Sequence, residues 1–339
     1  MDLDALVAPL RADNISGASA LTARAARLVE ETAVGAPART AGELTALLRA
    51  LLLRVLDAQP SMAPLVALAR EVLLSLEGAD GLAAAREAAS RAAQDLAREL
   101  GTGVAEVARR AADRLPPGGR VLTLSRSETV RETLLVAARR GRLGEVVCLE
   151  SRPLREGAAL ADELARAGTR VLYAVDAALE SLVADSGTVL LGADSVGDRG
   201  IVNKIGSVAA ARAGAAHGLP VLVAVDRSKL LPPGFPQPTG DDRPAAEVWA
   251  KAESGGAAAG ESAANAHPGV RVWNRYFEVI DPSLVGLVVT QDGALPPAEL
   301  LARRQALRVP AALREWAVDR LAGPPASEEP PPSPPGTRR

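Results

Sequence analysis

The sequence predicts an α/β protein in which an all-helical N-terminal domain precedes a Rossmann-like domain with a mainly parallel sheet. A change of periodicity predicts this division. Before about residue 114, Leu, Ala and Val recur at the three- and four-residue spacing of amphipathic helices, and after it short apolar runs alternate with helix-length segments. The segment LPPGG at 115–119 lies between the two patterns, and proline and glycine both disfavour a continuing helix. We therefore expect a helical domain over 1–115 and an α/β domain over 116–322.

The expected strands are six short runs rich in Leu and Val. They lie at 120–124, 145–149, 170–173, 188–191, 220–225 and 287–290. Helical patterns separate several of them, at 129–140, 157–167 and 207–217. Alternation of this kind is typical of a parallel sheet with right-handed crossovers. The runs are almost continuously apolar, which indicates strands that are covered on both faces.

Two segments are expected to lie outside this regular structure. Residues 232–270 are rich in Pro, Gly, Ala and Asp, which predicts a long flexible loop with one helical turn around 245–251. The tail 323–339 consists mostly of Pro, Ser and charged residues and is expected to be disordered.

Composition excludes several classes of function. A net charge of −2 argues against a nucleic-acid-binding protein, which would carry a clustered basic excess. One cysteine and two histidines exclude a metal centre built on those ligands, and no cofactor is expected. Residues 1–10 do not form a signal peptide, and no apolar run is long enough for a membrane helix. We therefore expect a cytoplasmic protein.

The candidate binding residues follow the predicted strands, where ligands bind in open α/β sheets. Ser125 and Ser127 lie at the start of the helix after the first strand, where their hydroxyls could bind phosphate. The alternative for Ser127 is that it only caps the helix. Arg152 follows the second strand and offers a fork for a phosphate or carboxylate, the alternative being a solvated or salt-bridged side chain.

Two further segments follow later strands. Asp194 is placed to exchange a proton with a substrate, and Asn203 and Lys204, expected just before a helix at Ser207, are suited to a phosphate. Their alternative is an Asp turn and a plain helix start. Lys229 follows the strand at 220–225, and since only three of the 39 basic residues are lysines, two lysines at such places suggest a required point charge.

In combination these motifs resemble the family of the initiation factor 2B alpha, beta and delta subunits, which includes ribose-1,5-bisphosphate isomerase and methylthioribose-1-phosphate isomerase. The resemblance rests on the order and spacing of ESRPLREG, GAD, GIVNKIGS and VLVAVDRSK, and on the closing segment NRYFEVIDPSLVGLVVTQDGALPP. It is strong over about residues 120–300 and chiefly architectural before them.

The resemblance implies roles for individual residues. In the isomerases a cysteine and an aspartate move protons, and these positions correspond to Ser125 and Asp194. A hydroxyl is a far weaker acid than a thiol, so Ser125 replaces it poorly. Cys148 lies in a predicted strand and is expected to be buried rather than reactive.

The N-terminal part also departs from the isomerase pattern. The Arg-Gly-Ala signature of the isomerases is represented by Ser16, Gly17 and Ala18, of which Gly17 and Ala18 are retained as candidate phosphate-binding residues. An arginine-proline pair is represented by Gln59 and Pro60, so two phosphate-clamping arginines are absent.

Half of a bisphosphate site is therefore retained. This favours a protein that binds a phosphorylated sugar or nucleotide without the thiol-dependent chemistry. The alternatives are an aldose–ketose isomerase that uses Asp194 with Ser125 or water, and a scaffold that binds nothing. The resemblance further implies a homodimer or higher homo-oligomer assembled through the α/β domain.

Overall fold

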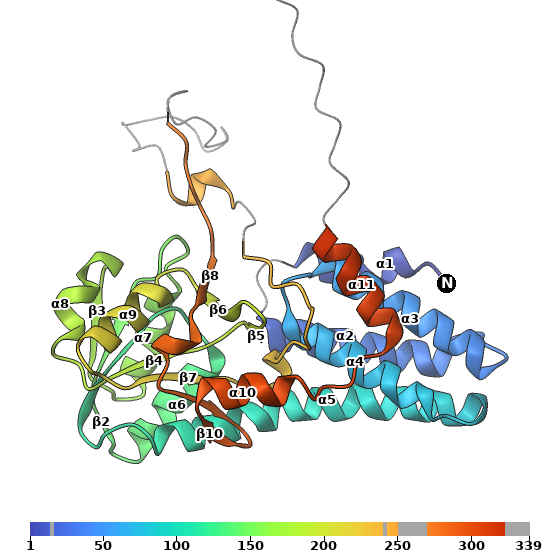
Figure 1. Ribbon diagram of the computed structural model, residues 1–339, viewed down its shortest axis with the longest axis horizontal. Coiled ribbons are helices and arrows are strands. Elements are labelled where there is room, and N and C mark those ends of the chain that lie inside the picture. The colour runs from blue at the N-terminus through green and yellow to red at the C-terminus, as the bar shows by residue number, and fades with distance from the viewer. Residues whose placement is uncertain (14–16, 240–242, 250–269, 323–339) are drawn as a thin grey trace, which may run out of the picture.

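The computed structural model describes residues 1–13, 17–239, 243–249 and 270–322. It has a helical part and an α/β part that lie side by side along the long axis of the molecule, as Figure 1 shows. The predicted fold class is confirmed. Among the described residues, no helix has the length and apolar character needed to cross a membrane.

The helical part consists of α1 (Leu3–Ala12), α2 (Ala18–Gly35), α3 (Ala41–Ala58), α4 (Ala63–Glu77) and α5 (Gly81–Ala112). Their periodic Leu, Val and Ala side chains form one core. The helix α11 (Ala311–Ala322) and the segment after β7 complete this core through Trp316 and Phe235, whose ring centroids are 6.4 Å apart. The C-terminal part of the chain thus returns to the helical part, which Figure 1 shows in red over the blue helices.

The main sheet has seven strands in the order β10-β9-β7-β4-β1-β2-β3. They are β1 (Gly119–Thr123), β2 (Leu143–Leu149), β3 (Val171–Ala174), β4 (Thr188–Leu191), β7 (Val221–Ala224), β9 (Leu287–Thr290) and β10 (Gly293–Leu295). All neighbouring pairs are parallel except β9 and β10. The six predicted strands are present, with ends that differ by at most two residues.

Helices cover both faces of this sheet. Val121 and its neighbours on one face pack with α5, α6 (Glu128–Arg139) and α7 (Glu156–Arg166). Leu122 and the alternate residues pack with α8 (Leu179–Val183), α9 (Ser207–Ala216) and α10 (Pro297–Arg304). Because the central strands β4 and β7 are buried on both faces, their sequences read as continuous apolar runs rather than alternating ones.

A second, antiparallel sheet was not predicted. It contains β5 (Ser195–Gly197), β6 (Gly200–Lys204) and β8 (Phe277–Ile280). Asn203 and Lys204 do precede a helix that begins at Ser207, as expected, but they end a strand, β6, that was not predicted. Pairing of β6 with β8, more than 70 residues later, fixes their direction, and a single-chain pattern does not reveal such a distant partner.

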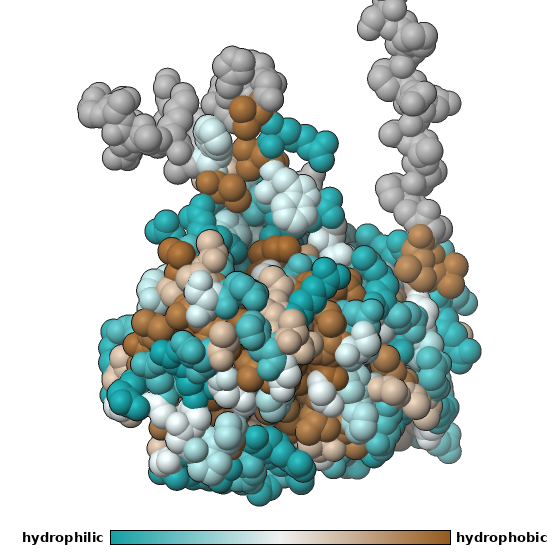
Figure 2. Space-filling model, turned by 60° about the vertical axis from the view of Figure 1, so that its left-hand side comes forward, coloured by the Kyte–Doolittle hydropathy of each residue, from teal (hydrophilic) through white to brown (hydrophobic). Residues whose placement is uncertain are grey.

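The predicted loop at 232–270 is described only in part. It contains the short 3-10 turn η3 (Ala245–Glu247), which agrees with the expected helical turn. This turn and the segment 270–276 form a projection, which we call the arm (residues 243–249 and 270–276). Figure 2 shows the arm standing out from the body, and it carries the exposed side chains of Trp249 and Trp273. The predicted disordered tail 323–339 lies outside the described residues.

Candidate functional site

The strand order reverses direction between β1 and β4, the place at which open α/β sheets form a binding crevice. Side chains from three motifs meet there. A Cβ atom added at Gly192, just after β4, would lie 2.5 Å from Ser127 Oγ and 3.8 Å from Asn203 Oδ1. Gly192 therefore lets the residues after β1 and β6 approach the end of β4. We call the predicted residues gathered at these ends the strand-end site: Ser125, Ser127, Arg152, Asp194, Asn203, Lys204 and Lys229.

A hydrogen bond joins the first two motifs. The Ser125 backbone N–H donates to Ser151 Oγ at 2.6 Å, and both residues have left-handed backbones, with φ of 64° and 65°. Asp176, after β3, accepts bonds from the backbone N–H groups of Ser151 (2.8 Å) and Arg152 (2.7 Å). Left-handed serines cost conformational energy, so these bonds hold a strained loop in place.

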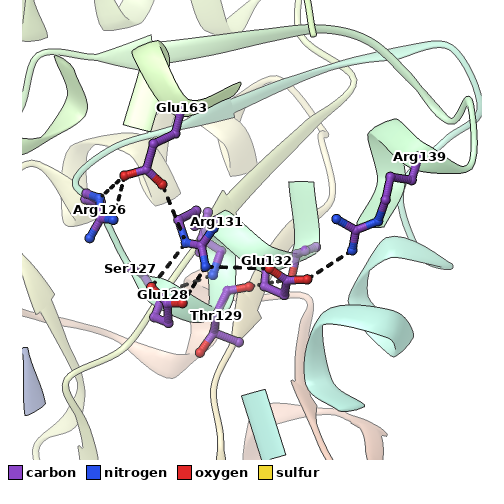
Figure 3. A network of polar contacts seen from close by, with 10 residues as sticks. Arg126, Ser127, Glu128, Thr129, Arg131, Glu132, Arg139 and Glu163 are labelled. Carbon is purple, nitrogen blue, oxygen red and sulfur yellow. Dashed lines mark hydrogen bonds and ion pairs between the residues drawn. The ribbon is translucent and has the colours of Figure 1, made fainter. Parts of the chain in front are cut away.

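The charged side chains after β1 point into a surface network, drawn in Figure 3. Arg126 donates to Glu163 of α7 at 2.8 Å through Nε, and Arg131 donates to Glu128 at 2.6 Å. Ser127 is the N-cap of α6, its Oγ accepting from the Val130 N–H at 3.5 Å. Ser127 thus caps the helix, and phosphate binding by its hydroxyl stays a prediction.

Arg152 is engaged by the arm. Its terminal guanidinium nitrogen donates to the backbone carbonyls of Glu247 and Val248, each at 3.3 Å. Glu247 in turn accepts from the Tyr276 hydroxyl at 2.6 Å and from the Asn274 amide at 2.8 Å. Among the residues that the structure describes, Arg152 forms no salt bridge, and it is not fully solvated because the arm carbonyls accept its hydrogen bonds.

Lys204 is buried and paired. Its Nζ donates to Glu156 Oε1 at 2.7 Å and lies 4.8 Å from the centre of the Tyr276 ring. The Arg243 guanidinium also lies against that ring, at 4.7 Å. The adjacent Asn203 donates from Nδ2 to Ser207 Oγ at 2.8 Å, which leaves its Oδ1 directed toward Gly192.

Asp194 is a partly buried acid at the end of β4. Desolvation raises the pKa of its carboxyl group, the nearby Lys229 and Lys204 ammonium groups oppose that shift, and Glu156 adds to it. Its backbone N–H is bonded to the Val202 carbonyl at 2.8 Å, but no described residue hydrogen-bonds to its carboxyl group. A carboxyl group with a raised pKa and no bonding partner among the described residues is suited to exchange a proton with a ligand.

Lys229 belongs to the short turn η2 (Arg227–Lys229), which Asp226 holds by accepting from the Ser228 N–H at 2.9 Å. Arg227 points away toward the helical part and pairs with Glu99. Within the described part of the chain, nothing forms an ion pair with the Lys229 ammonium. It is therefore a charge available near Asp194.

A cavity of about 190 Å³ lies between the helical and α/β parts, and Arg227 and Ser228 form part of its wall. Its arginines pair with neighbouring acids, as Arg70 does with Glu71. We assign the candidate site to the strand ends instead, because the Lys229 ammonium and the Asp194 carboxyl lie there without a bonding partner among the described residues.

The remaining predictions concern cysteine and the N-terminal motif. Cys148 is buried, as expected, and burial raises its pKa to about 12, so it supplies no thiolate near neutral pH. Gly17 caps α2 and a Cβ built there would meet nothing within 4 Å, while Ser16 lies outside the described residues. Binding by Gly17 and Ala18 stays a prediction.

Gln59 stabilises the end of α1. Its amide donates to the carbonyls of Leu10 (2.8 Å) and Asp13 (3.1 Å), at the end of α1. No group of three His, Cys, Asp or Glu side chains within the described residues could hold a metal ion.

Sequence reasoning missed four residues that shape the site: Glu156, Asp176, Glu247 and Tyr276. Asp176 follows a predicted strand and could have been found by the rule that found Arg152. Glu247 and Tyr276 reach the site through the arm, and no local pattern indicates that contact.

Comparison with known proteins points to one family. Residues 14–297 match the model of the Initiation factor 2 subunit family. A ribose 1,5-bisphosphate isomerase of Haloterrigena turkmenica is 28% identical over 289 residues, covering 85% of this chain and 88% of that protein. A methylthioribose-1-phosphate isomerase of Gemmatimonas aurantiaca is 35% identical over 205 residues, covering 56% and 54%.

Solved structures share the fold. The translation initiation factor eIF-2B of Pyrococcus horikoshii has a TM-score of 0.70 and 24% identity, covering 88% of this chain and 98% of that one. A chain from the tetrameric eIF2B-beta2-delta2 complex of C. thermophilum has a TM-score of 0.67 and 19% identity, covering 88% and 91%.

Proposed function

Because this chain belongs to the Initiation factor 2 subunit family, we propose that its strand-end site binds a phosphorylated sugar or nucleotide without the family's thiol-dependent isomerase chemistry. The observation that carries the proposal is Ser125. It occupies the end of β1, where the resemblance requires a thiol, and the chain's single cysteine is buried with a pKa of about 12.

The cationic and polar groups support phosphate binding. Lys229 offers an ammonium group that pairs with no described residue, Asn203 offers an amide beside Gly192, and the backbone after β1 opens helix α6. Phosphate oxygens accept hydrogen bonds from such groups, and helix starts favour anions. Arg152 adds a positive charge at the end of β2.

Isothermal titration calorimetry with ribose 1-phosphate and adenosine monophosphate tests this binding. Lys204→Ala leaves the Glu156 carboxylate without its ion-pair partner beside the phosphate position. It is therefore expected to weaken affinity by roughly ten- to a hundredfold, because two like charges then face each other in a partly buried site. Arg166→Ala, which removes an exposed arginine of α7, is the control. An unchanged titration for Lys204→Ala contradicts the site assignment.

A second candidate function is an isomerase that uses Asp194. The raised pKa of Asp194 favours it, because desolvation shifts the carboxyl pKa upward, toward the range in which a carboxyl group acts as a general acid or base. Incubation with pentose 1-phosphates and 1,5-bisphosphates, followed by assay of ketose formation, separates the two. Turnover that Asp194→Asn abolishes would replace the binding-only proposal.

We also propose a homodimer, or a higher homo-oligomer, assembled through the α/β part, and a cytoplasmic location. Solved relatives include an oligomeric complex, which supports the assembly. Light scattering is expected to give at least twice the chain mass of 34.9 kDa. A mass of one chain at micromolar concentration contradicts the proposal.

A further inference from the structure

Glu156 is held rigidly beside the strand-end site. It is the first residue of α7, and Gly157 after it packs so closely on the end of β2 that an added Cβ would lie 1.8 Å from the Leu149 carbonyl oxygen. Arg155 before it has a left-handed backbone, with φ of 58°. The backbone that carries the Glu156 side chain is therefore fixed in place.

The two oxygens of Glu156 differ. Oε1 accepts from the Lys204 ammonium at 2.7 Å, and the Lys204 side chain is only 4% exposed. Oε2 is buried and has no hydrogen-bond partner among the residues that the structure describes. A buried carboxylate oxygen without a donor is costly, so this atom is suited to a ligand that brings a hydroxyl or amine donor.

The charge of Glu156 acts across the site. Burial raises the pKa of the Asp194 carboxyl and of the Tyr276 hydroxyl, with Glu247 contributing at Tyr276, and the nearby Glu156 charge adds to both shifts. It also neutralises Lys204, which leaves Lys229 as the lysine available for a phosphate. A second phosphate placed near Glu156 would meet a desolvated carboxylate of the same sign.

We propose that Glu156 selects the class of ligand: its free oxygen accepts a hydrogen bond from a hydroxyl of a monophosphorylated sugar, and its charge rejects a bisphosphate. This inference rests on the proposed phosphosugar binding. It agrees with the absence of the two arginines in the N-terminal motifs, where Gln59 instead holds the end of α1.

The test is calorimetric titration of the full chain with ribose 1-phosphate and with ribose 1,5-bisphosphate. The native protein is expected to bind the monophosphate at least about tenfold more tightly. Glu156→Gln keeps the shape of the side chain but removes its charge. The affinity for the bisphosphate relative to the monophosphate is therefore expected to rise by about tenfold or more.

Two further variants keep the test decisive. Glu163→Gln makes the same chemical change on the outer surface of α7, where the side chain pairs with Arg126, and is expected to leave the ratio unchanged. Glu156→Asp keeps the charge and is expected to keep the rejection of the bisphosphate, which makes it informative if Glu156→Gln folds poorly.

The outcomes separate the two levels of the proposal. Three results overturn the role of Glu156 alone. They are tighter binding of the bisphosphate by the native protein, an affinity ratio that Glu156→Gln leaves unchanged, and bisphosphate binding by Glu156→Asp that is as tight as its monophosphate binding. Failure of the native protein to bind either sugar phosphate overturns the proposed function and this inference together.

Discussion

The two sides of the strand-end site differ in how their polar groups are satisfied. On the side of β1 and β2, Arg126, Ser127 and Arg152 all have partners within the protein, as Figure 3 shows for Arg126 and Glu163. On the side of β4 and β7, the Asp194 carboxyl and the Lys229 ammonium have no hydrogen-bond or ion-pair partner among the described residues. The first side is built mainly as a scaffold, and the second is the side that a ligand would complete.

The largest expected effect comes from disturbing the scaffold. Gly157→Ala places a methyl group against the Leu149 carbonyl and is expected to lower the free energy of unfolding by about 3 kcal/mol or more, measured by urea denaturation. Gly101→Ala is the matched control, because that glycine lies in α5 with nothing within 4 Å of an added Cβ. Equal stability of the two variants would contradict the close packing of α7 on β2.

The next effect concerns ligand affinity and separates the two sides. Lys229→Met removes the available charge and is expected to weaken ribose 1-phosphate binding by roughly ten- to a hundredfold. Arg126→Met removes a charge that already pairs with Glu163 and is expected to change binding less than about threefold. If calorimetry showed the same loss of affinity in both variants, the proposed difference between the two sides of the site would be contradicted.

A pH effect is expected from Asp194. Burial raises its pKa, so the folded chain holds this proton more tightly than the unfolded chain does, and the group favours folding most below the ordinary Asp pKa. That contribution is lost as the pH rises through the raised pKa. Asp194→Asn stays neutral, so its melting temperature is expected to exceed that of the native protein by a few degrees at pH 8, with no excess at pH 3.5.

Asp162→Asn provides the control for this effect, since Asp162 is exposed on α7 and pairs with Arg166. The melting temperature of Asp162→Asn is expected to equal that of the native protein at every pH. If Asp194→Asn raised the melting temperature by the same amount at pH 8 and at pH 3.5, the Asp194 carboxyl would not be desolvated.

The smallest effect concerns backbone strain. Ser125→Gly relieves a left-handed serine and is expected to raise the free energy of unfolding by about 0.5 kcal/mol. Ser151→Gly relieves the same strain but removes the hydroxyl that accepts from Ser125, so it is expected to be neutral or destabilising. Urea denaturation of both variants checks this, and a destabilised Ser125→Gly would mean that the serine side chain supports the loop.

Sequence patterns sufficed for six of the seven strands of the main sheet, because these strands are apolar runs and helical patterns separate several of them. They missed the three-residue antiparallel edge strand β10. They also placed Asp194, Arg152 and Lys229, since the chain itself marks the end of each strand. They failed for β5, β6 and β8, whose pairing depends on segments far apart in the sequence. They also missed Glu156 and the hydrogen bonds between the arm and Arg152, because both contacts form only when elements far apart in the sequence pack together.

The central claim is that a phosphorylated sugar completes the unpaired side of the strand-end site. A crystal structure of the protein grown with ribose 1-phosphate tests it most directly. The account predicts density for the phosphate among Ser125, Asn203 and Lys229, with a sugar hydroxyl directed to Glu156. At saturating concentration, an empty strand-end site, or sugar phosphate bound only in the cavity beside Arg227, would contradict it.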